Sequence, residues 1–281
     1  MLSYRHAFHA GNHADVLKHA VLVHLLAYLT KKDKPLWYVD THAGAAGYAL
    51  DEAWAQKNAE FETGITPLWA RKDAPPLLSA YLDLVRSLNP GGDLRAYPGS
   101  AQVAMTLLRP QDRIRLFELH PSEGRGLKQH FSKDSPRVLV QAGDGFDLLR
   151  SVLPPPSRRG LVLVDPSYED KGDYARARGA LEDALGRFAT GVYMLWYPIV
   201  QRRESEQFPA TLKRLQKKDW LHAALTVKSP SPDGYGLHGS GLFILNPPWD
   251  LPGLLKEALP YLVKVLGQDP GARYELECEL A

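Results

Sequence analysis

The sequence contains a single cysteine, Cys278, among its 281 residues. One thiol cannot form a disulfide within the chain or complete a cysteine-based zinc or iron–sulfur site, which excludes disulfide-rich domains and cysteine-ligated metal proteins. The chain also lacks a long apolar run. The longest, Ala20–Leu29, is interrupted by His24 and is shorter than the roughly 20 residues that span a bilayer. Because no signal-peptide pattern surrounds it either, we expect a cytoplasmic protein without membrane association.

A marked excess of charge of one sign is also missing, because 34 Lys and Arg residues face 32 Asp and Glu residues and leave a net charge of +2. Proteins that coat nucleic acid carry a much larger basic excess. A nucleic-acid partner would therefore have to be bound locally. The apolar fraction of 44% and the charged fraction of 23% are typical of a globular protein, and the length fits one large α/β domain, with or without an insertion.

Short apolar runs alternate with helix-like stretches from about residue 34 onward. This alternation predicts an α/β fold with a seven-stranded, mostly parallel sheet and flanking helices. Several runs end on a polar or acidic residue followed closely by glycine or proline, namely Asp40, Glu118, Asp165, Tyr197 and Asn246. Because ligands bind beyond the carboxyl ends of parallel strands, we expect these ends to form one crevice. The predicted strands are Leu36–Asp40, Ile114–Glu118, Val138–Gln141, Leu161–Asp165, Val192–Tyr197, His222–Val227 and Leu242–Asn246.

Two segments interrupt this alternation. The first begins with a predicted helix that is capped by Asn12. The second separates the first two strands by more than one crossover helix and is predicted to be a small helical insertion, with its clearest helix at Leu77–Leu88. The chain is therefore divided into an N-terminal helical segment of the active site (1–33), a core (34–48 and 100–281) and an insertion subdomain (49–99). The apolar face of the first helix is predicted to contain Val16, Ala20, Val23 and Ala27.

The first strand ends in Asp40 and is followed by a turn that contains Gly44 and Gly47. Glycines in such a turn let the backbone approach a ligand closely. The spacing is not the dinucleotide pattern G-x-G-x-x-G, and the carboxylate before the glycines favours a ligand with positive charge, such as S-adenosylmethionine. An ordinary strand-to-helix turn is the alternative for this segment taken alone.

Two further strand ends match other parts of an adenosyl ligand. Glu118 closes the second strand and is suited to the two hydroxyls of a ribose. Asp144 lies between Gly143 and Gly145 and is suited to the exocyclic amine of adenine. A surface glutamate and an Asp-Gly turn are the alternative interpretations. The succession of three acidic strand ends favours the adenosyl site.

The fourth strand leads into Asp165-Pro166-Ser167-Tyr168. An aromatic exocyclic amine is a poor nucleophile, because its lone pair is delocalised into the ring, until acceptors polarise its N–H bonds. The Asp165 carboxylate and the Pro166 carbonyl are suited to that task. The ring of Tyr168 can stack on an extruded base, a contact worth about 1–3 kcal/mol. A proline turn with a buried tyrosine is the alternative.

Two other segments resemble this loop or its surroundings. Asn246-Pro247-Pro248-Trp249 follows the last strand, and we assign it to the turn before a C-terminal helix at Pro252–Leu266. Trp196-Tyr197-Pro198 follows the fifth strand and either lines the base pocket or packs in the core.

Four of the ten histidines lie between His6 and His19. His9 and His13 are one helical turn apart, but no HExxH motif or cysteine accompanies them, so no metal is expected. The aromatic and cationic neighbours suit a base and phosphates, which makes His6 a candidate RNA contact. Lys18 and His19 are candidates to reach the carboxylate of the cofactor.

Several motifs together resemble the bacterial 23S ribosomal RNA adenine-N6-methyltransferase family over essentially the whole chain. They are residues 1–19, Asp40-Thr41-His42-Ala43-Gly44, Tyr97-Pro98-Gly99-Ser100, Glu118-Leu119-His120-Pro121, Gly143-Asp144-Gly145, Arg158-Arg159-Gly160 and Phe188-Ala189-Thr190-Gly191. The resemblance implies a class I, Rossmann-like methyltransferase fold, S-adenosylmethionine as methyl donor, and an unpaired or extruded adenine of 23S rRNA as acceptor.

The resemblance also implies roles for single residues. The catalytic carboxylate falls on Asp165 and an RNA-contacting residue on Tyr4, while the cofactor positions fall on His19, His42, Ser100, Glu118, Asp144 and Gly145. The catalytic loop departs from the Asp-Pro-Pro-Tyr pattern of the family, because Ser167 stands in its third position. A proline there would restrict the backbone of Pro166, whose carbonyl is the proposed acceptor.

The same proline loop could serve other acceptors, so a DNA adenine and a protein glutamine amide remain alternatives. A nicotinamide oxidoreductase would need the G-x-G-x-x-G turn that the chain lacks, and an RNA-binding module without activity would have no use for Asp165. No obligate protein partner is indicated.

Overall fold

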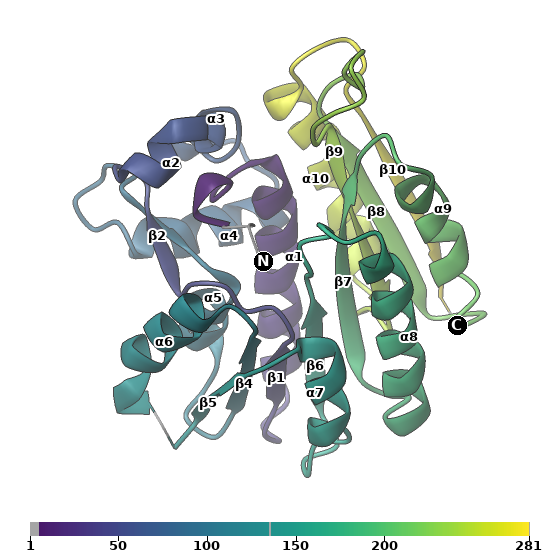
Figure 1. The fold of residues 1–281 in the computed structure, drawn as a ribbon. Coiled ribbons are helices and arrows are strands. Elements are labelled where there is room, and N and C mark those ends of the chain that lie inside the picture. The colour runs from purple at the N-terminus through teal and green to yellow at the C-terminus, as the bar shows by residue number, and fades with distance from the viewer. Residues whose placement is uncertain (1–5, 135, 281) are drawn as a thin grey trace.

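A computed structural model describes residues 6–134 and 136–280, so the predicted RNA contact Tyr4 lies outside the described residues. The main sheet has the strand order β10-β8-β9-β7-β6-β1-β4-β5 (Figure 1). Its strands are β1 (Trp37–Asp40), β4 (Arg113–Glu118), β5 (Val138–Ala142), β6 (Gly160–Val164), β7 (Val192–Ile199), β8 (Trp220–Thr226), β9 (Gly239–Leu245) and β10 (Arg273–Glu279).

The strands β5, β4, β1, β6 and β7 pair in parallel, whereas β9 runs antiparallel between β7 and β8. The chain order reverses beside β1, whose neighbours are β4 and β6. A crevice forms at such a reversal, outside the carboxyl ends of the strands. The predicted α/β fold with a mostly parallel sheet is confirmed, and the sheet places a ligand site above β1 and β6.

The predicted number of seven strands was wrong for the main sheet, which has eight. All seven predicted strands are present, with their ends shifted by a few residues. The missed strand β10 pairs antiparallel with β8 at the edge of the sheet. Its charged side chains alternate with Tyr274, Leu276 and Cys278, and only Leu276 among its residues is not exposed. Charged, exposed edge strands of this kind resist pairing with other chains and lack the apolar runs that predicted the others.

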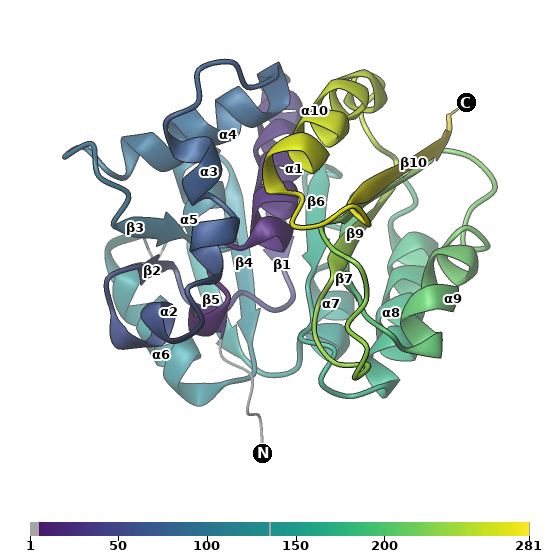
Figure 2. The ribbon, with the colours of Figure 1, turned by 90° about the horizontal axis from the view of Figure 1, so that it is seen from above.

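Helices cover both faces of the sheet (Figures 1 and 2). The strands of the centre are apolar on both sides. In β6, Leu161 and Leu163 belong to one core cluster and Val162 and Val164 to the other, as expected for a strand buried between two helical layers. One layer contains α1 (His13–Thr30), α4 (Pro76–Ser87), α5 (Ser100–Leu107), α6 (Pro121–His130) and α10 (Leu251–Leu266). The other contains α7 (Gly145–Val152), α8 (Gly172–Arg187) and α9 (Arg203–Leu212).

Helix α1 is buried on nearly all sides. Its predicted cap is confirmed, because the side chain of Asn12 accepts a hydrogen bond from the Asp15 amide at 2.9 Å. The prediction of a single apolar face was wrong at Ala27, which is exposed. Because α1 contacts α4 and α5 as well as the sheet side of the core, it needs no single apolar stripe. None of the described helices is both long and apolar enough to cross a bilayer.

The segment between β1 and α5 is not only helical. It contains α2 (Ala53–Asn58), the short 3-10 helix η2 (Glu60–Thr63), α3 (Thr66–Trp69) and α4. It also contains a second, unpredicted sheet in which β2 (Gly47–Ala49) pairs antiparallel with β3 (Ala96–Pro98). These strands have three residues each, too few for an alternating pattern to stand out. The division of the chain into three segments stays a prediction.

Candidate functional site

A pocket of about 1010 Å³ opens above the carboxyl ends of the central strands. Its wall brings together residues from the N-terminal segment, the turn after β1, the ends of β4 to β7 and the loop between β8 and β9. The predicted site residues that line it are His6, Lys18, His19, His42, Ser100, Glu118, Asp144, Gly145, Asp165, Pro166 and Tyr168.

Asp40 supports the pocket from beneath. Its carboxylate is fully buried and accepts hydrogen bonds from the hydroxyls of Ser100 at 2.6 Å and Tyr38 at 2.8 Å, and from the amide of His42 at 3.2 Å. Burial raises the pKa of Asp40 to about 6, although the hydrogen bonds from Ser100 and Tyr38 oppose this rise. Asp40 therefore fixes the first residue of α5 and the start of the turn, rather than forming part of the wall.

Glu118 ties the turn after β1 to the end of β4. One carboxylate oxygen accepts a hydrogen bond from the amide of Gly44 at 2.8 Å, and the other accepts one from the amide of His120 at 2.7 Å. Burial raises the pKa of Glu118. Each oxygen of a carboxylate can accept a second hydrogen bond, so Glu118 can still bind the hydroxyls of a ribose.

Asp144 caps helix α7 and lies next to a cation that the sequence did not predict. Its carboxylate accepts hydrogen bonds from the amide of Phe146 at 3.0 Å and from the guanidinium of Arg176, on α8, at 2.5 Å. Position 145 requires glycine because the backbone of Thr41 packs directly against it, and a Cβ atom there would lie 1.8 Å from the carbonyl oxygen of Thr41. Helix α7 thus begins in direct contact with the turn after β1.

His42 and Phe146 form an aromatic corner in the pocket wall, with ring centroids 4.8 Å apart. Burial lowers the pKa of His42 to about 4, so its ring is neutral near pH 7. The guanidinium of Arg176 covers the Phe146 ring at 4.6 Å, in the range of a cation–π contact. These planar groups can pack against the faces and edges of a nucleobase.

Asp165 ends a chain of charges that begins in the N-terminal segment. The ammonium of Lys18 lies 2.7 Å from Oδ2 of Asp165 and 2.9 Å from Oδ1 of Asp15. The other oxygen of Asp15 lies 2.8 Å from Nε2 of His6, a residue of the short 3-10 helix η1 (His6–Phe8), and 3.0 Å from the amide of Gly11. Lys18 was predicted to reach the carboxylate of a cofactor, and the structure places it against the catalytic candidate instead.

This chain of charges is internally compensated. Burial alone would lower the pKa of Lys18, but the carboxylates of Asp15 and Asp165 hold it above its ordinary value. Burial would raise the pKa of Asp15, but His6 and Lys18 hold it well below its usual range. Asp15 was not among the predicted site residues, although its position three residues before Lys18 in a helix is the spacing at which such pairs form.

His19 lies beside this cluster and is neutral. Its Nδ1 lies 3.1 Å from the hydroxyl of Tyr97, which in turn lies 2.9 Å from the hydroxyl of Tyr81. Burial lowers the pKa of His19 to about 3.

The loop after β6 presents backbone groups and buries its aromatic ring. Tyr168 has a left-handed backbone (φ +54°), and its ring packs against Tyr174, Trp196 and Phe208. Its hydroxyl donates to the carbonyl of Trp196 at 2.8 Å. Within the described part of the chain, the Pro166 carbonyl accepts no hydrogen bond and the Ser167 amide donates none. The carbonyl of Pro166 is therefore available to a ligand.

The other proline motif, Asn246-Pro247-Pro248-Trp249, lies at the opposite end of the strands from the pocket. Because β9 is antiparallel to β7, the segment that follows it emerges beside the amino ends of the parallel strands. There the side chain of Asn246 donates to the carbonyls of Ala189 and Gly191 at 2.8 and 2.6 Å, and α10 begins five residues later. The motif is the turn before this helix, as predicted.

The segment Trp196-Tyr197-Pro198 lies within β7, near its carboxyl end, and has both of the functions considered for it. Trp196 and Pro198 line the pocket, whereas Tyr197, between them, does not. Successive side chains of a strand point to opposite faces, and the hydroxyl of Tyr197 lies 2.7 Å from Nε2 of His222 in the core.

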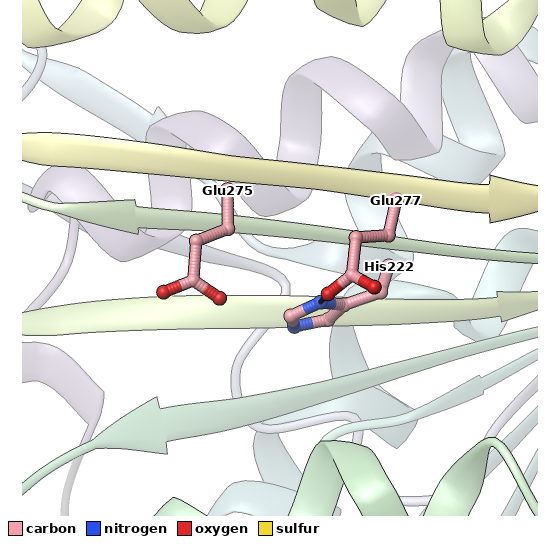
Figure 3. A group of neighbouring side chains, drawn as sticks. All are labelled: His222, Glu275 and Glu277. Atoms are coloured by element: carbon pink, nitrogen blue, oxygen red, sulfur yellow. Dashed lines mark ion pairs between the residues drawn. The ribbon is translucent and has the colours of Figure 1, made fainter.

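A group of side chains with the composition of a metal site lies away from the pocket. His222 on β8 and Glu275 and Glu277 on β10 offer atoms within 4.8 Å of one another (Figure 3). The ammonium of Lys213 lies 2.8 and 2.9 Å from the two oxygens of Glu277, so a cation of the protein already neutralises this carboxylate. Of the histidines considered as metal ligands, His9 has its Nδ1 atom 2.8 Å from Glu60.

The fold and the pocket together define a class of protein. The order β5-β4-β1-β6-β7-β9-β8 with an antiparallel β9 is that of a class I methyltransferase. Of the strand ends expected to form one crevice, Glu118 and Asp165 line the pocket together with Asp144, whereas Asp40, Tyr197 and Asn246 do not.

Comparison with known proteins identifies the family. A family model described as "Ribosomal RNA large subunit methyltransferase D, RlmJ" matches residues 33–277. The ribosomal RNA large subunit methyltransferase J of Escherichia coli (strain K12) is 46% identical over 262 residues, which cover 93% of each chain. The protein of the same name from Haemophilus influenzae is 45% identical over 267 residues, 95% of this chain and 94% of that one. The chain belongs to this family of ribosomal RNA methyltransferases, as its motifs predicted.

A solved structure agrees with this assignment. The crystal structure of a Legionella pneumophila protein has a TM-score of 0.86 to this chain at 39% sequence identity, and the match covers 96% of this chain and 98% of the other.

Proposed function

We propose that the chain transfers a methyl group from S-adenosylmethionine to the N6 amine of an unpaired or extruded adenine in 23S rRNA. The observation that carries this proposal is the pair of acceptors in the pocket wall, the carboxylate of Asp165 and the free carbonyl of Pro166. The names of the relatives, which refer to the large ribosomal subunit, support the choice of RNA. Such an enzyme acts in the cytoplasm and needs no protein partner for the reaction itself.

The pocket fits a nucleoside cofactor together with a target base. Its volume of about 1010 Å³ reaches the upper end of the roughly 300–1,000 Å³ that holds one small ligand. Glu118 would bind the ribose, and the corner formed by His42 and Phe146 would hold the adenine ring beside Asp144. His19, Ser100 and Gly145 complete the proposed cofactor site, and Asp40 positions Ser100 from below. When bound, the cofactor supplies an already activated methyl group.

The residues of the chain contribute by orientation. Lys18 binds Oδ2 of Asp165, whereas Oδ1 accepts no hydrogen bond from the described residues. Oδ1 and the Pro166 carbonyl can therefore accept the two N–H bonds of the adenine amine, which localises the lone pair on nitrogen. Preorganised acceptors of this kind need no rearrangement during the reaction, and a fixed amine is aligned with the methyl group. Oδ1 can then take the proton that the amine loses.

The N-terminal segment and Tyr168 are the proposed contacts to RNA. The ring of His6 lies at the pocket wall and is oriented by Asp15. Tyr168 is only 3% exposed and its ring is packed beneath the pocket, so the structure has the buried tyrosine considered as the alternative and not a ring open to stacking; Tyr168 would contact the RNA from the floor of the pocket. Residues 49–99, as a subdomain, would extend the surface beside the pocket.

Transfer of a radioactive methyl group from S-adenosylmethionine to 23S rRNA fragments, DNA and protein, assayed in parallel, tests the acceptor. We expect label in RNA that is recovered as N6-methyladenosine. Label only in DNA adenine or in protein glutamine would replace the proposal by one of its alternatives.

Asp165→Asn tests the mechanism. We expect a fall in the methyl-transfer rate of about 100-fold or more, the effect of losing one preorganised group, while S-adenosylmethionine binds with nearly the parent affinity. Asn246→Ala, in the other proline motif, is the control and should affect stability alone. Full activity of Asp165→Asn would contradict the mechanism.

A further inference from the structure

The loop between β8 and β9 presents an aromatic side chain at the pocket. Tyr235 is 81% exposed, the largest exposed fraction among the large hydrophobic residues described. It stands between Gly234 and Gly236, whose φ angles of +80° and +95° are in the left-handed region that favours glycine. A Cβ atom at either glycine would have no neighbour within 4 Å. The tip of the loop thus projects freely, above the carboxyl ends of the strands (Figure 2).

The base of this loop is fixed even though its tip projects. The amide of Val227 donates to the carbonyl of His238 at 2.9 Å, and the amide of His238 donates to the carbonyl of Ile199 at 3.2 Å. At the tip, the Tyr235 amide donates to the carboxylate of Asp233 at 3.1 Å. The ring is therefore carried on a defined turn, and no ring contact with another described residue covers it.

The position of Tyr235 separates it from an ordinary exposed aromatic residue. Residues 233–237 line the same pocket as Asp165 and Pro166. Trp249 is almost equally exposed, at 76%, but it lies in the turn before α10, at the opposite end of the strands from the pocket. Single exposed aromatic residues are common, so exposure alone carries no function. An exposed aromatic ring at the rim of a pocket for a nucleotide, in contrast, is placed where it can contact the nucleic acid.

The chemistry of the loop selects the face of a base over a phosphate. Lys228, two residues after β8, is the single Lys or Arg of the loop 227–238, and the charged group beside Tyr235 at the tip is the carboxylate of Asp233. A phosphate would be repelled by this carboxylate, whereas the ring offers a surface on which any unpaired base can stack.

We propose that Tyr235 forms a stacking subsite for a second unpaired base, the neighbour of the target adenine. This subsite rests on the proposed function. The target adenine must enter far enough for its amine to reach Asp165, whose side chain is only 13% exposed. The base next to it then lies at the rim, where Tyr235 stands. The enzyme accordingly recognises an unpaired dinucleotide, which contributes to its choice of RNA site.

A double-mutant cycle between protein and RNA tests the subsite. The RNA is an oligonucleotide with one unpaired adenine, prepared with a normal or an abasic neighbour on each side in turn. For the intact RNA, we expect Tyr235→Ala to raise KM about 5- to 150-fold, the range given by 1–3 kcal/mol per stacked base. The kcat at saturating RNA and the dissociation constant of S-adenosylmethionine should not change, and Tyr235→Phe should behave like the parent.

The abasic RNA gives the decisive comparison. With the stacked neighbour removed, the KM of the parent should rise by the same factor. The KM of Tyr235→Ala on this abasic RNA should be little higher than its KM on the intact RNA. Trp249→Ala is the matched control and should leave KM unchanged for both RNAs.

Equal KM values for Tyr235→Ala and the parent on intact RNA would overturn the subsite. Fully additive effects of Tyr235→Ala and the abasic site would overturn it as well. In both cases the parent still methylates RNA, so the proposed function stands. A parent enzyme that methylates DNA or protein but no RNA would overturn the proposed function and the subsite together.

Discussion

Asp15→Asn tests whether the buried charges of the N-terminal helix hold the active site together. The carboxylate of Asp15 is approached by His6 and the Gly11 amide at one oxygen and by Lys18 at the other. An asparagine has only one acceptor oxygen. If it keeps the first two partners, its amide group faces the ammonium of Lys18, which then retains Asp165 alone.

The expected loss of stability follows from the burial of this cluster. Breaking a buried pair by removing one charge costs about 3–5 kcal/mol, and the remaining contact of Lys18 with Asp165 favours the lower value. For a chain of this length, about 3 kcal/mol corresponds to a fall of roughly 6–12 °C in Tm. The rate of methyl transfer should fall as well, because Lys18 loses one of the two carboxylates that position it.

Thermal unfolding followed by circular dichroism measures the effect, with Asp250→Asn as the matched control. Asp250 also pairs with a residue of α1, with 3.1 Å between its carboxylate and His24, but it is 23% exposed. Pairs near the surface contribute at most about 1 kcal/mol, so the control should lose less than about 4 °C. A Tm of Asp15→Asn that equals that of Asp250→Asn would refute the argument from burial.

Ser167→Pro should fold, remain active and gain about 0.4–1 kcal/mol in stability, because the amide that proline removes donates no hydrogen bond to a described residue. Loss of single-turnover methyl transfer with normal cofactor binding would show that the loop works in another conformation. Gly145→Ala should weaken S-adenosylmethionine binding at least tenfold by calorimetry, since its Cβ would collide with a backbone oxygen at 1.8 Å, whereas Gly179→Ala, with no atom within 4 Å, should bind normally. Acid should destabilise the protein through His19: burial lowers its pKa to about 3, so the stabilisation is complete above the unfolded pKa of about 6.5 and is lost as the pH falls toward 3. Between pH 7 and pH 5, the free energy of unfolding measured in urea should therefore fall by about 2 kcal/mol less in His19→Gln than in the parent. An equal fall in both proteins would contradict this.

The sequence was sufficient where a signal is local. Apolar runs predicted seven of the eight strands of the main sheet, and the acidic strand ends Glu118 and Asp165 meet in one pocket as expected. Asp40 shows the limit of this reasoning, because its position at a strand end is the same as that of Glu118, yet it is sealed beneath the pocket by Ser100 and Tyr38. Which carboxylate faces a ligand depends on what packs over it.

Residues whose function depends on a distant partner were missed for the same reason. Arg176 reaches Asp144 from 32 positions away along the chain, and nothing near it in the sequence distinguishes it from other helical arginines. Tyr235 was overlooked because a tyrosine between glycines reads as an ordinary turn until the loop is seen to reach the pocket.

The burial of helix α1 has a mechanical consequence for the reaction centre. The helix has 18 residues and is therefore roughly 27 Å long, and a close-packed interior leaves it no room to slide or turn about its axis. Lys18 lies near one end, while Leu25 and Leu26, with no exposed surface, lie about two turns further along. The buried apolar side chains of α1 thus fix the position of the Lys18 ammonium. Its distance from Asp165 is determined partly by contacts that involve no charge.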